Sequence, residues 1–229
     1  WTVVGSTAGK NLYAGDFLGG DTSILYAIND DNKLYAVDTA TAAATEIGTT
    51  NPPAGTSFTG LSGAPDGTMY GLTSTCSVSY LVTVDVTTGQ TTSIGSLSGV
   101  GCGIDLAFNS NDGMIYVVDL LTDSLYKVDP ETTVATLVGS TGINANYAQG
   151  MDFEEESGVL YWAAYNGSTS TGELRVLDMT TGNSSLIGTF PSGAETDCLA
   201  FTTGGISDVP WLSEDPMAGT VPAGGSLPI

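Results

Sequence analysis

The stretch Leu174-Arg-Val-Leu-Asp-Met-Thr-Thr-Gly182 shows the unit from which the chain is built. Apolar residues alternate up to Asp178, as a half-buried strand requires, and the following Thr-Thr-Gly supplies a turn. A strand of this kind also ends in aspartate three times earlier, at Asp38, Asp85 and Asp129. A carboxylate in this position can accept hydrogen bonds from backbone N–H groups two residues on. We therefore expect these four aspartates to stabilise turns.

Three further rows of short segments repeat with the same period. One row is centred on tyrosines that follow one another by 44, 46 and 45 residues: Tyr26, Tyr70, Tyr116 and Tyr161. A second row ends in glycine: Gly5, Gly48, Gly95, Gly139 and Gly188. A third row is short and apolar and spans residues 14–18, 58–63, 104–108, 151–153 and 199–201. Four short strands in each repeat of 43–49 residues, without a helical period, are typical of the blades of a β-propeller.

The number of repeats indicates an incomplete ring. The chain begins with an outer strand over residues 1–6, passes through four complete blades, and ends the repeat with an inner strand over residues 198–203. We predict an all-β propeller over residues 1–203, with four complete four-stranded blades and an incomplete fifth blade. The two middle strands of that blade must come from elsewhere, because an open gap would expose two strand edges.

The composition argues against several classes of function. The 25 acidic residues face only four basic ones, so a net charge of -21 would repel nucleic acid. The chain has no histidine, which removes Ser-His-Asp and Cys-His nucleophile pairs and the usual zinc sites. No run of about 18 apolar residues is present, so we expect no membrane span. Few charged residues and abundant Thr, Ser, Gly and Asn are typical of a secreted β-protein, and we expect a non-enzymatic, extracellular one.

Several segments carry a resemblance to a known group of propellers. They are Leu137-Val-Gly-Ser-Thr-Gly142, Tyr147-Ala-Gln-Gly-Met-Asp-Phe153, Leu160-Tyr-Trp-Ala-Ala164 and Ala194-Glu-Thr-Asp-Cys-Leu-Ala200. They resemble blades of YncE-like propellers in large secreted bacterial proteins, over about residues 1–203. The resemblance implies a module without catalytic activity that accompanies peptidase, Ig-like or surface-anchoring modules. Residues 208–213 and 216–226 resemble the opening strand of such an Ig-like module.

Residues 204–229 are expected to form an extended arm. Four prolines restrict this arm to edge or interrupted pairing, and a lone strand cannot bury its own apolar side chains. Those side chains are Val209, Trp211, Leu212 and Val221. One interpretation is a linker to a missing Ig-like domain. The other is an arm that pairs with the incomplete sheet of the next copy, which predicts a homo-oligomer or filament.

Acidic side chains are expected to converge at the central channel. They lie at or beside the innermost strands: Asp16, Asp105, Asp152, Asp197 and Glu195. Clustered carboxylates suit Ca²⁺, a hard cation that prefers oxygen ligands, and we therefore name these five residues as a candidate calcium site. The competing interpretation is a set of solvated acids at a wet channel mouth. Paired carboxylates could also cleave glycosides, but the adjacent glutamates at 154–156 fall in a predicted turn.

Aromatic and amide side chains near the fourth blade suggest a carbohydrate site. Flat rings and amides suit a sugar, and the candidate residues are Tyr147, Gln149, Tyr165 and Asn166. The alternation over residues 160–165 places half of the neighbouring rings between blades, which is the competing interpretation.

The chain has three cysteines, Cys76, Cys102 and Cys198. Cys76 and Cys102 fall in two loop types that emerge on the same face of a propeller, so we expect a disulfide between them, as in an oxidising compartment. Cys198 is expected to be a buried free thiol. These features together favour an extracellular structural subunit that self-associates by strand exchange. The alternatives are a glycan- or calcium-binding adhesion module accessory to a secreted peptidase or other surface protein and, less favoured, a hydrolase.

Overall fold

The computed structural model describes residues 2–147 and 149–201, which fold into four antiparallel sheets of four strands. Blade 1 contains β1 (Leu12–Leu18), β2 (Asp21–Asn29), β3 (Lys33–Asp38) and β4 (Ala44–Thr49). Blade 2 contains β5 (Ser57–Gly63), β6 (Met69–Ser74), β7 (Ser79–Val84) and β8 (Thr91–Ser96). Blade 3 contains β9 (Gly103–Asn109), β10 (Met114–Asp119), β11 (Ser124–Val128) and β12 (Ala135–Ser140). Blade 4 contains β13 (Gly150–Glu154), β14 (Val159–Asn166), β15 (Thr171–Leu177) and β16 (Ser184–Thr189).

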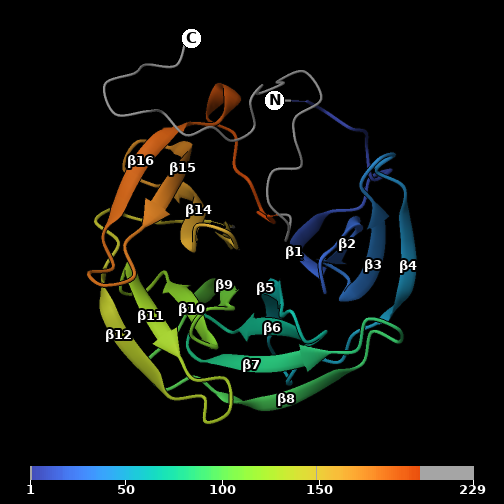
Figure 1. Cartoon of the computed structure of the whole chain (residues 1–229), viewed down its shortest axis with the longest axis horizontal. Coiled ribbons are helices and arrows are strands. Elements are labelled where there is room, and N and C mark those ends of the chain that lie inside the picture. The colour runs from blue at the N-terminus through green and yellow to red at the C-terminus, as the bar shows by residue number, and fades with distance from the viewer. Residues whose placement is uncertain (1, 148, 202–229) are drawn as a thin grey trace, which may run out of the picture.

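The strands of each blade are hydrogen-bonded in chain order. Figure 1 shows β1, β5 and β9 near the centre and β4, β8, β12 and β16 at the rim. The only helical element that the structure describes is a short 3-10 turn at Pro191–Gly193. The prediction of an all-β propeller with four complete blades is confirmed.

The hydrophobic core lies between blades, because alternate residues of a strand point to opposite faces of its sheet. Three clusters fill the boundaries between blades 1 and 2, 2 and 3, and 3 and 4. The first leucine of the third strand is fully buried in each: Leu34, Leu81 and Leu125. Blades 1, 2 and 3 therefore each depend on the next blade to cover the apolar residues of one face.

The strand-ending aspartates form the predicted turns. Asp38 accepts hydrogen bonds from the backbone N–H groups of Ala40 (3.0 Å) and Thr41 (2.8 Å). Asp85, Asp129 and Asp178 accept equivalent bonds from the residue two positions on. Hydrogen bonds from the hydroxyl groups of Thr41 and Thr87 contribute most to stabilising the ionised Asp38 and Asp85, and they lower the pKa values of these carboxylates. At Asp129 and Asp178 the backbone bonds contribute most and lower the pKa values in the same way. The interpretation of these aspartates as turn residues is confirmed.

The predicted strands of the fifth blade differ from expectation. Residues 2–6 and 198–201 are described, but neither segment forms a strand. The physical reason is that, in the described parts of the chain, no middle strand lies beside them to complete a ladder. Figure 1 shows the chain before residue 201 returning to the centre between β14 and β1. The arm residues Val209, Trp211, Leu212 and Val221 lie outside the described residues.

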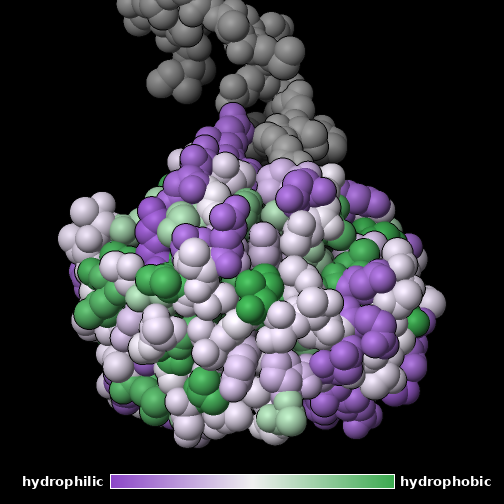
Figure 2. Space-filling view, turned by 90° about the horizontal axis from the view of Figure 1, so that it is seen from below, coloured by the Kyte–Doolittle hydropathy of each residue, from purple (hydrophilic) through white to green (hydrophobic). Residues whose placement is uncertain are grey.

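Among the described residues, no helix is long and apolar enough to cross a membrane. On the side of the molecule seen in Figure 2, hydrophobic residues form small separate groups between polar ones. Small groups of exposed apolar residues are common on the surfaces of folded proteins.

Candidate functional site

The innermost strands carry carboxyl groups that connect neighbouring blades. Asp16 of β1 accepts hydrogen bonds from the backbone N–H groups of Phe17 (2.7 Å) and of Gly63 in blade 2 (2.8 Å). Asp105 of β9 likewise accepts from Leu106 (2.9 Å) and from Met151 in blade 4 (2.5 Å). One side chain thus joins the backbones of two blades.

Two further side chains extend this pattern around the channel. Asp152 of β13 accepts hydrogen bonds from Phe153 (2.7 Å) and from Phe201 (2.6 Å), which lies in the segment after blade 4. In blade 2 a serine takes the place of the aspartate, because Ser62 Oγ accepts from the N–H of Phe108 at 2.9 Å. The sequence analysis missed Ser62, although Ser62-Gly63 aligns with Asp16-Phe17 and Asp152-Phe153 in the innermost row. That alignment is the signal that could have found it.

Burial makes these carboxyl groups hard to ionise. Asp16, Asp105 and Asp152 are each at least nine-tenths buried. Burial raises the pKa of Asp16 to about 7, against the bonds from Gly63 and Phe17 that favour the ionised form. Burial also raises the pKa values of Asp105 and Asp152 well above the usual range, and the negative charges of neighbouring inner aspartates add to the effect. The centre of the propeller therefore holds a set of interacting acids.

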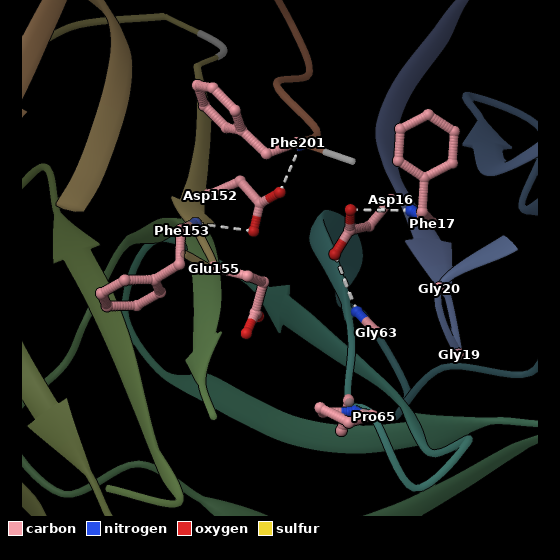
Figure 3. Close-up of a pocket in the computed structure, with 11 residues that line it drawn as sticks. Asp16, Phe17, Gly19, Gly20, Gly63, Pro65, Asp152, Phe153, Glu155 and Phe201 are labelled. Atoms are coloured by element: carbon pink, nitrogen blue, oxygen red, sulfur yellow. Dashed lines mark hydrogen bonds between the residues drawn. The ribbon is translucent and has the colours of Figure 1, made fainter. Parts of the chain in front are cut away.

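A cavity of about 290 Å³ opens at one end of these strands. Figure 3 shows Asp16 and Asp152 on opposite sides of it, with Glu155 on the same side as Asp152. Apolar residues complete the lining, including Phe17, Phe153, Phe201 and Pro65. Glu155 accepts a hydrogen bond from Ser110. No basic residue lines this cavity within the described chain, so it is suited to neutral or cationic molecules rather than to anions.

The structure brings only part of the candidate calcium site together. Asp16, Asp105 and Asp152 lie near enough to influence one another electrostatically, but their oxygens accept backbone hydrogen bonds. Asp197 is partly buried, which raises its pKa, whereas Glu195 is exposed. Within residues 2–147 and 149–201, no three Asp, Glu, Cys or His side chains form a group that could hold a metal ion. The inner aspartates thus have a structural use that the sequence analysis did not foresee.

The candidate carbohydrate residues separate into two pairs. Tyr147 is exposed and meets Tyr165 edge to face, with ring centroids 5.1 Å apart. Gln149 is buried and accepts a hydrogen bond from the indole N–H of Trp162 at 2.7 Å. Asn166 is buried and donates to Glu173 at 3.2 Å. Tyr147 is therefore available at the surface and Tyr165 is partly so, while the two amides connect strands within blade 4.

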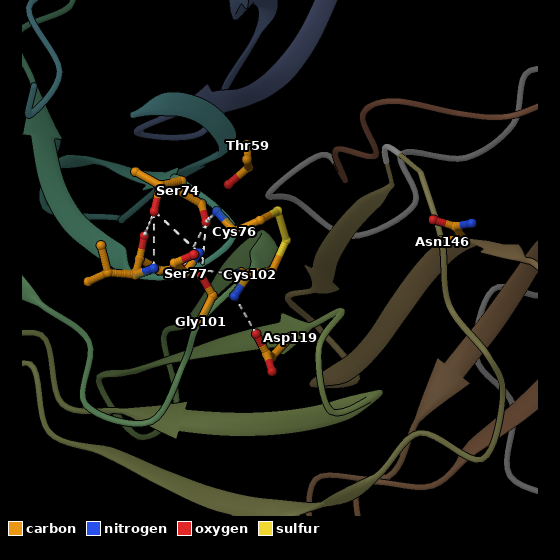
Figure 4. Close-up of a disulfide and its surroundings, with 12 residues drawn as sticks. Thr59, Ser74, Cys76, Ser77, Gly101, Cys102, Asp119 and Asn146 are labelled. Atoms are coloured by element: carbon orange, nitrogen blue, oxygen red, sulfur yellow. Dashed lines mark hydrogen bonds between the residues drawn. A yellow bond between two sulfur atoms is a disulfide. The ribbon is translucent and has the colours of Figure 1, made fainter. Parts of the chain in front are cut away.

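The predicted disulfide between Cys76 and Cys102 is confirmed, and Cys198 is a free cysteine. Figure 4 shows the disulfide between the loop after β6 and the loop before β9, so it ties blade 2 to blade 3. The N–H of Cys102 donates to the buried Asp119 at 2.6 Å. Cys198 is partly buried, and burial raises the pKa of its thiol, which makes it a poor nucleophile.

Comparisons with known proteins agree on the fold alone. No protein-family model matches the chain, and no curated protein matches its sequence. The PQQ-bound aldose sugar dehydrogenase from Streptomyces coelicolor is similar with a TM-score of 0.58 and 15% identity, over 87% of this chain and 74% of that one. The calcium-binding protein regucalcin from Agrobacterium tumefaciens is similar with a TM-score of 0.52 and 20% identity, over 84% of this chain and 63% of the regucalcin chain. Virginiamycin B lyase from Staphylococcus aureus is similar with a TM-score of 0.55 and 12% identity, over 84% of this chain and 60% of the lyase chain.

These similarities place the chain in the broad class of β-propeller proteins. Its four blades span less than two thirds of the regucalcin and lyase chains. By their names the similar proteins include two enzymes and a calcium-binding protein, and identities of 20% or less show a shared fold without a shared activity. The more specific resemblance to YncE-like propellers and to an Ig-like strand stays a prediction.

Proposed function

We propose that this protein is a non-enzymatic, extracellular structural propeller that self-associates by strand exchange. In this proposal the C-terminal arm of one copy pairs with the incomplete fifth blade of the next, which builds a filament or a surface layer. The observation that carries the proposal is the position of the two ends of the described chain. Residues 198–201 lie beside the innermost strands of blades 4 and 1, and residues 2–6 lie beside the turn after the third strand of blade 1. In the proposal these two segments are the inner and outer edges of the fifth blade.

The inner edge is held by the segment over residues 198–201. Phe201 donates its N–H to Asp152, as Gly63 does to Asp16 between complete blades. Its ring packs against Tyr161 of blade 4 with centroids 4.8 Å apart. On the other side, the thiol of Cys198 donates to the carbonyl oxygen of Gly15 in blade 1 at 2.9 Å. This segment therefore bridges blade 4 and blade 1.

The outer edge is held by residues 2–6. A Cβ at Gly5 would lie 2.9 Å from the carbonyl oxygen of Thr41, so the N-terminal segment is close to the third turn of blade 1. Val3 and Val4 remain exposed. Two fixed edges without a described strand between them form a template for added strands, since backbone groups at a sheet edge need partners.

The disulfide supports the extracellular part of the proposal, because such bonds persist in oxidising compartments. The absence of enzymatic activity is supported by the lack of histidine in the sequence and by the backbone bonds that occupy the inner carboxyl groups.

The test compares the full chain with a chain truncated after Gly205. We expect light scattering to give a mass above the monomer that grows with concentration for the full chain, and a constant monomer mass for the truncated one. Electron microscopy should show fibres or sheets only for the full chain. A full chain that stays monomeric at high concentration, or a truncated chain that still assembles, would refute the proposal.

The second candidate is a glycan- or calcium-binding adhesion module accessory to a secreted peptidase or other surface protein. The exposed Tyr147, with Tyr165 packed edge to face against it, favours the glycan form, and the similarity to calcium-binding regucalcin supports the calcium form. Tyr147→Ala should abolish binding to a glycan array without lowering Tm, whereas the exposed Leu186→Ala should not affect binding. A Tm that is the same in calcium and in chelator would exclude the calcium form.

A further inference from the structure

Each outer strand contains a glycine, and in blades 1 to 3 this glycine lies against the turn that follows the third strand of the next blade. A Cβ at Gly48 in blade 1 would overlap the carbonyl oxygen of Thr88 in blade 2. A Cβ at Gly139 in blade 3 would overlap the carbonyl oxygen of Thr181 in blade 4. These glycines are needed because the turn of the next blade packs directly on the backbone of the outer strand, where a side chain would overlap it.

The turn after the third strand has the same backbone conformation in all four blades. It starts at the strand-ending aspartate, and its fifth residue donates its N–H to the carbonyl oxygen of that aspartate, at 2.7–2.8 Å. The fifth residue has a positive φ in every blade: Ala42, Gly89, Thr133 and Gly182. The glycine of the following outer strand stands six residues further on, as Gly188 follows Gly182.

Gly188 is the member of this row that receives no described turn. No atom of the described residues lies within 4 Å of a Cβ built there. The preceding Ile187 is 54% exposed, whereas its counterparts Ile94 and Val138 are partly buried by the next blade. Leu174 is also partly exposed, although Leu34, Leu81 and Leu125 are fully buried at the same position. Gly188, Ile187 and Leu174 thus form an open seat, shaped for one more strand and turn.

We infer that this seat binds residues Asp215–Gly219 of a second copy, with the preceding residues running beside Leu174. The inference rests on the proposed self-association and names its contact. The segment Asp215-Pro-Met-Ala-Gly219 has the spacing of the four turns, with glycine where they have a positive φ. Proline follows aspartate as in Asp129-Pro130.

The surrounding positions extend the match. Trp211 precedes Asp215 by four residues, as Leu174 precedes Asp178, and Gly225 follows Gly219 by six. One position departs from the pattern, since Glu214 stands where the complete blades have an aliphatic residue. In the proposed contact, the strand before Asp215 therefore lacks one of the apolar residues found in the complete blades. The turn over Gly188 matches the other turns better than this strand matches theirs.

The length of the chain favours a second copy over the same molecule. In the complete blades, Asp38 follows Phe17 by 21 residues and Asp178 follows Phe153 by 25. These residues make two full strands with their connections. Asp215 follows Phe201 by only 14 residues, which is too few to form two strands and reach the turn position in order. The arm of another copy does not have to form these two strands before it reaches the turn position. In extended form, its 14 residues after Phe201 can reach a neighbouring molecule roughly 45 Å away.

The test uses the full chain with Gly188→Val, which adds a side chain at a position where a Cβ has no described atom within 4 Å. We expect monomer mass by light scattering and an unchanged Tm. Leu186→Val is the matched control, because its counterpart Leu137 is 57% exposed even where the next blade is present. This control should assemble like the unmodified chain.

A second variant, Gly219→Val, should also be monomeric, because a β-branched residue does not tolerate a positive φ. Each variant alone lacks one half of the contact, but a mixture has one intact seat and one intact turn. An equimolar mixture should therefore give a complex of twice the monomer mass that does not grow further.

The outcomes separate the two levels of the proposal. If the unmodified chain is monomeric, the proposed self-association is wrong. If it assembles and Gly188→Val assembles equally well, self-association stands and the seat is wrong. A mixture of the two variants that stays monomeric, or that grows beyond a dimer, would also overturn the seat.

Discussion

The two faces of blade 4 have similar residues but different surroundings. Trp162 points to blade 3 and is fully buried, whereas its neighbour Tyr161 points to the fifth-blade position and is only partly buried. Val138 of blade 3 is covered by blade 4, whereas the equivalent Ile187 is exposed. The comparison shows that burial in this protein is supplied by the next blade and that the last blade lacks this cover among the described residues.

The strongest test of this comparison replaces adjacent aromatic residues on one strand. Trp162→Ala should lower the free energy of unfolding by about 3–5 kcal/mol, because it opens a cavity between blades 3 and 4 and leaves Gln149 without its indole partner. Tyr161→Ala should cost only about 1–2 kcal/mol in the truncated monomer, where its ring meets Phe201 alone among described aromatic partners. Denaturant unfolding measures both, and equal losses would contradict the difference between the faces.

The disulfide gives the next largest effect. Cys76 and Cys102 close a loop of 26 residues between two complete blades, and loop-closure entropy predicts a loss of about 3 kcal/mol when both become serine. Cys198→Ser, at the open side, should change stability little because serine keeps a donor toward Gly15. Thermal unfolding of the two variants provides the measurement, and a larger loss for Cys198→Ser would reverse the expected ranking.

The inner aspartates predict a pH dependence of stability. The pKa of Asp16 is raised in the folded state to about 7, so folding favours its protonated form. The stability that this group contributes is present below its unfolded pKa of about 4 and is lost as the pH rises through about 7. Tm should therefore fall between pH 5 and pH 8.

Asp16→Asn provides the control for this pH effect. The variant should show a smaller fall in Tm over the same interval, because the group that ionises is removed. Tm values that rise with pH in the unmodified protein would contradict the assignment. Below about pH 4 the turn aspartates act in the opposite direction, since their lowered pKa values make the folded state lose stability as they protonate.

The smallest effect concerns two equivalent turns. Asp178→Ala loosens the turn that rests on Gly139 between two complete blades, and Asp38→Ala loosens the turn that rests on Gly5 near the chain end. We expect Tm to fall by a few degrees for Asp178→Ala and by less for Asp38→Ala. Equal values from calorimetry would show that the contact with the following glycine adds nothing to the turn.

Much of the fold could be predicted because the repeat is local. The alternation before Asp178 and the turn after it fix a strand and its end within a few residues, and the recurrence of this unit fixes the blades. The pairing of Cys76 with Cys102 followed from the loop types once the blades were assigned. Of the four candidate carbohydrate residues, Tyr147 is exposed and Tyr165 is partly buried, but the sequence did not indicate that Gln149 and Asn166 are buried and hydrogen-bonded within blade 4.

The sequence by itself therefore determined the strands and turns of the four complete blades and the acidic, histidine-free composition of the chain, because these depend on composition and on neighbours along the backbone. Only the tertiary structure decided what the repeated residues contact. It showed that Asp16, Asp105 and Asp152 bind backbone N–H groups of the following segment, and that Gly188 is the member of its row left without a described turn. The reason is physical: these hydrogen bonds join residues more than 40 positions apart, and equivalent glycines such as Gly139 and Gly188 have similar local sequences whether or not a neighbouring blade covers them.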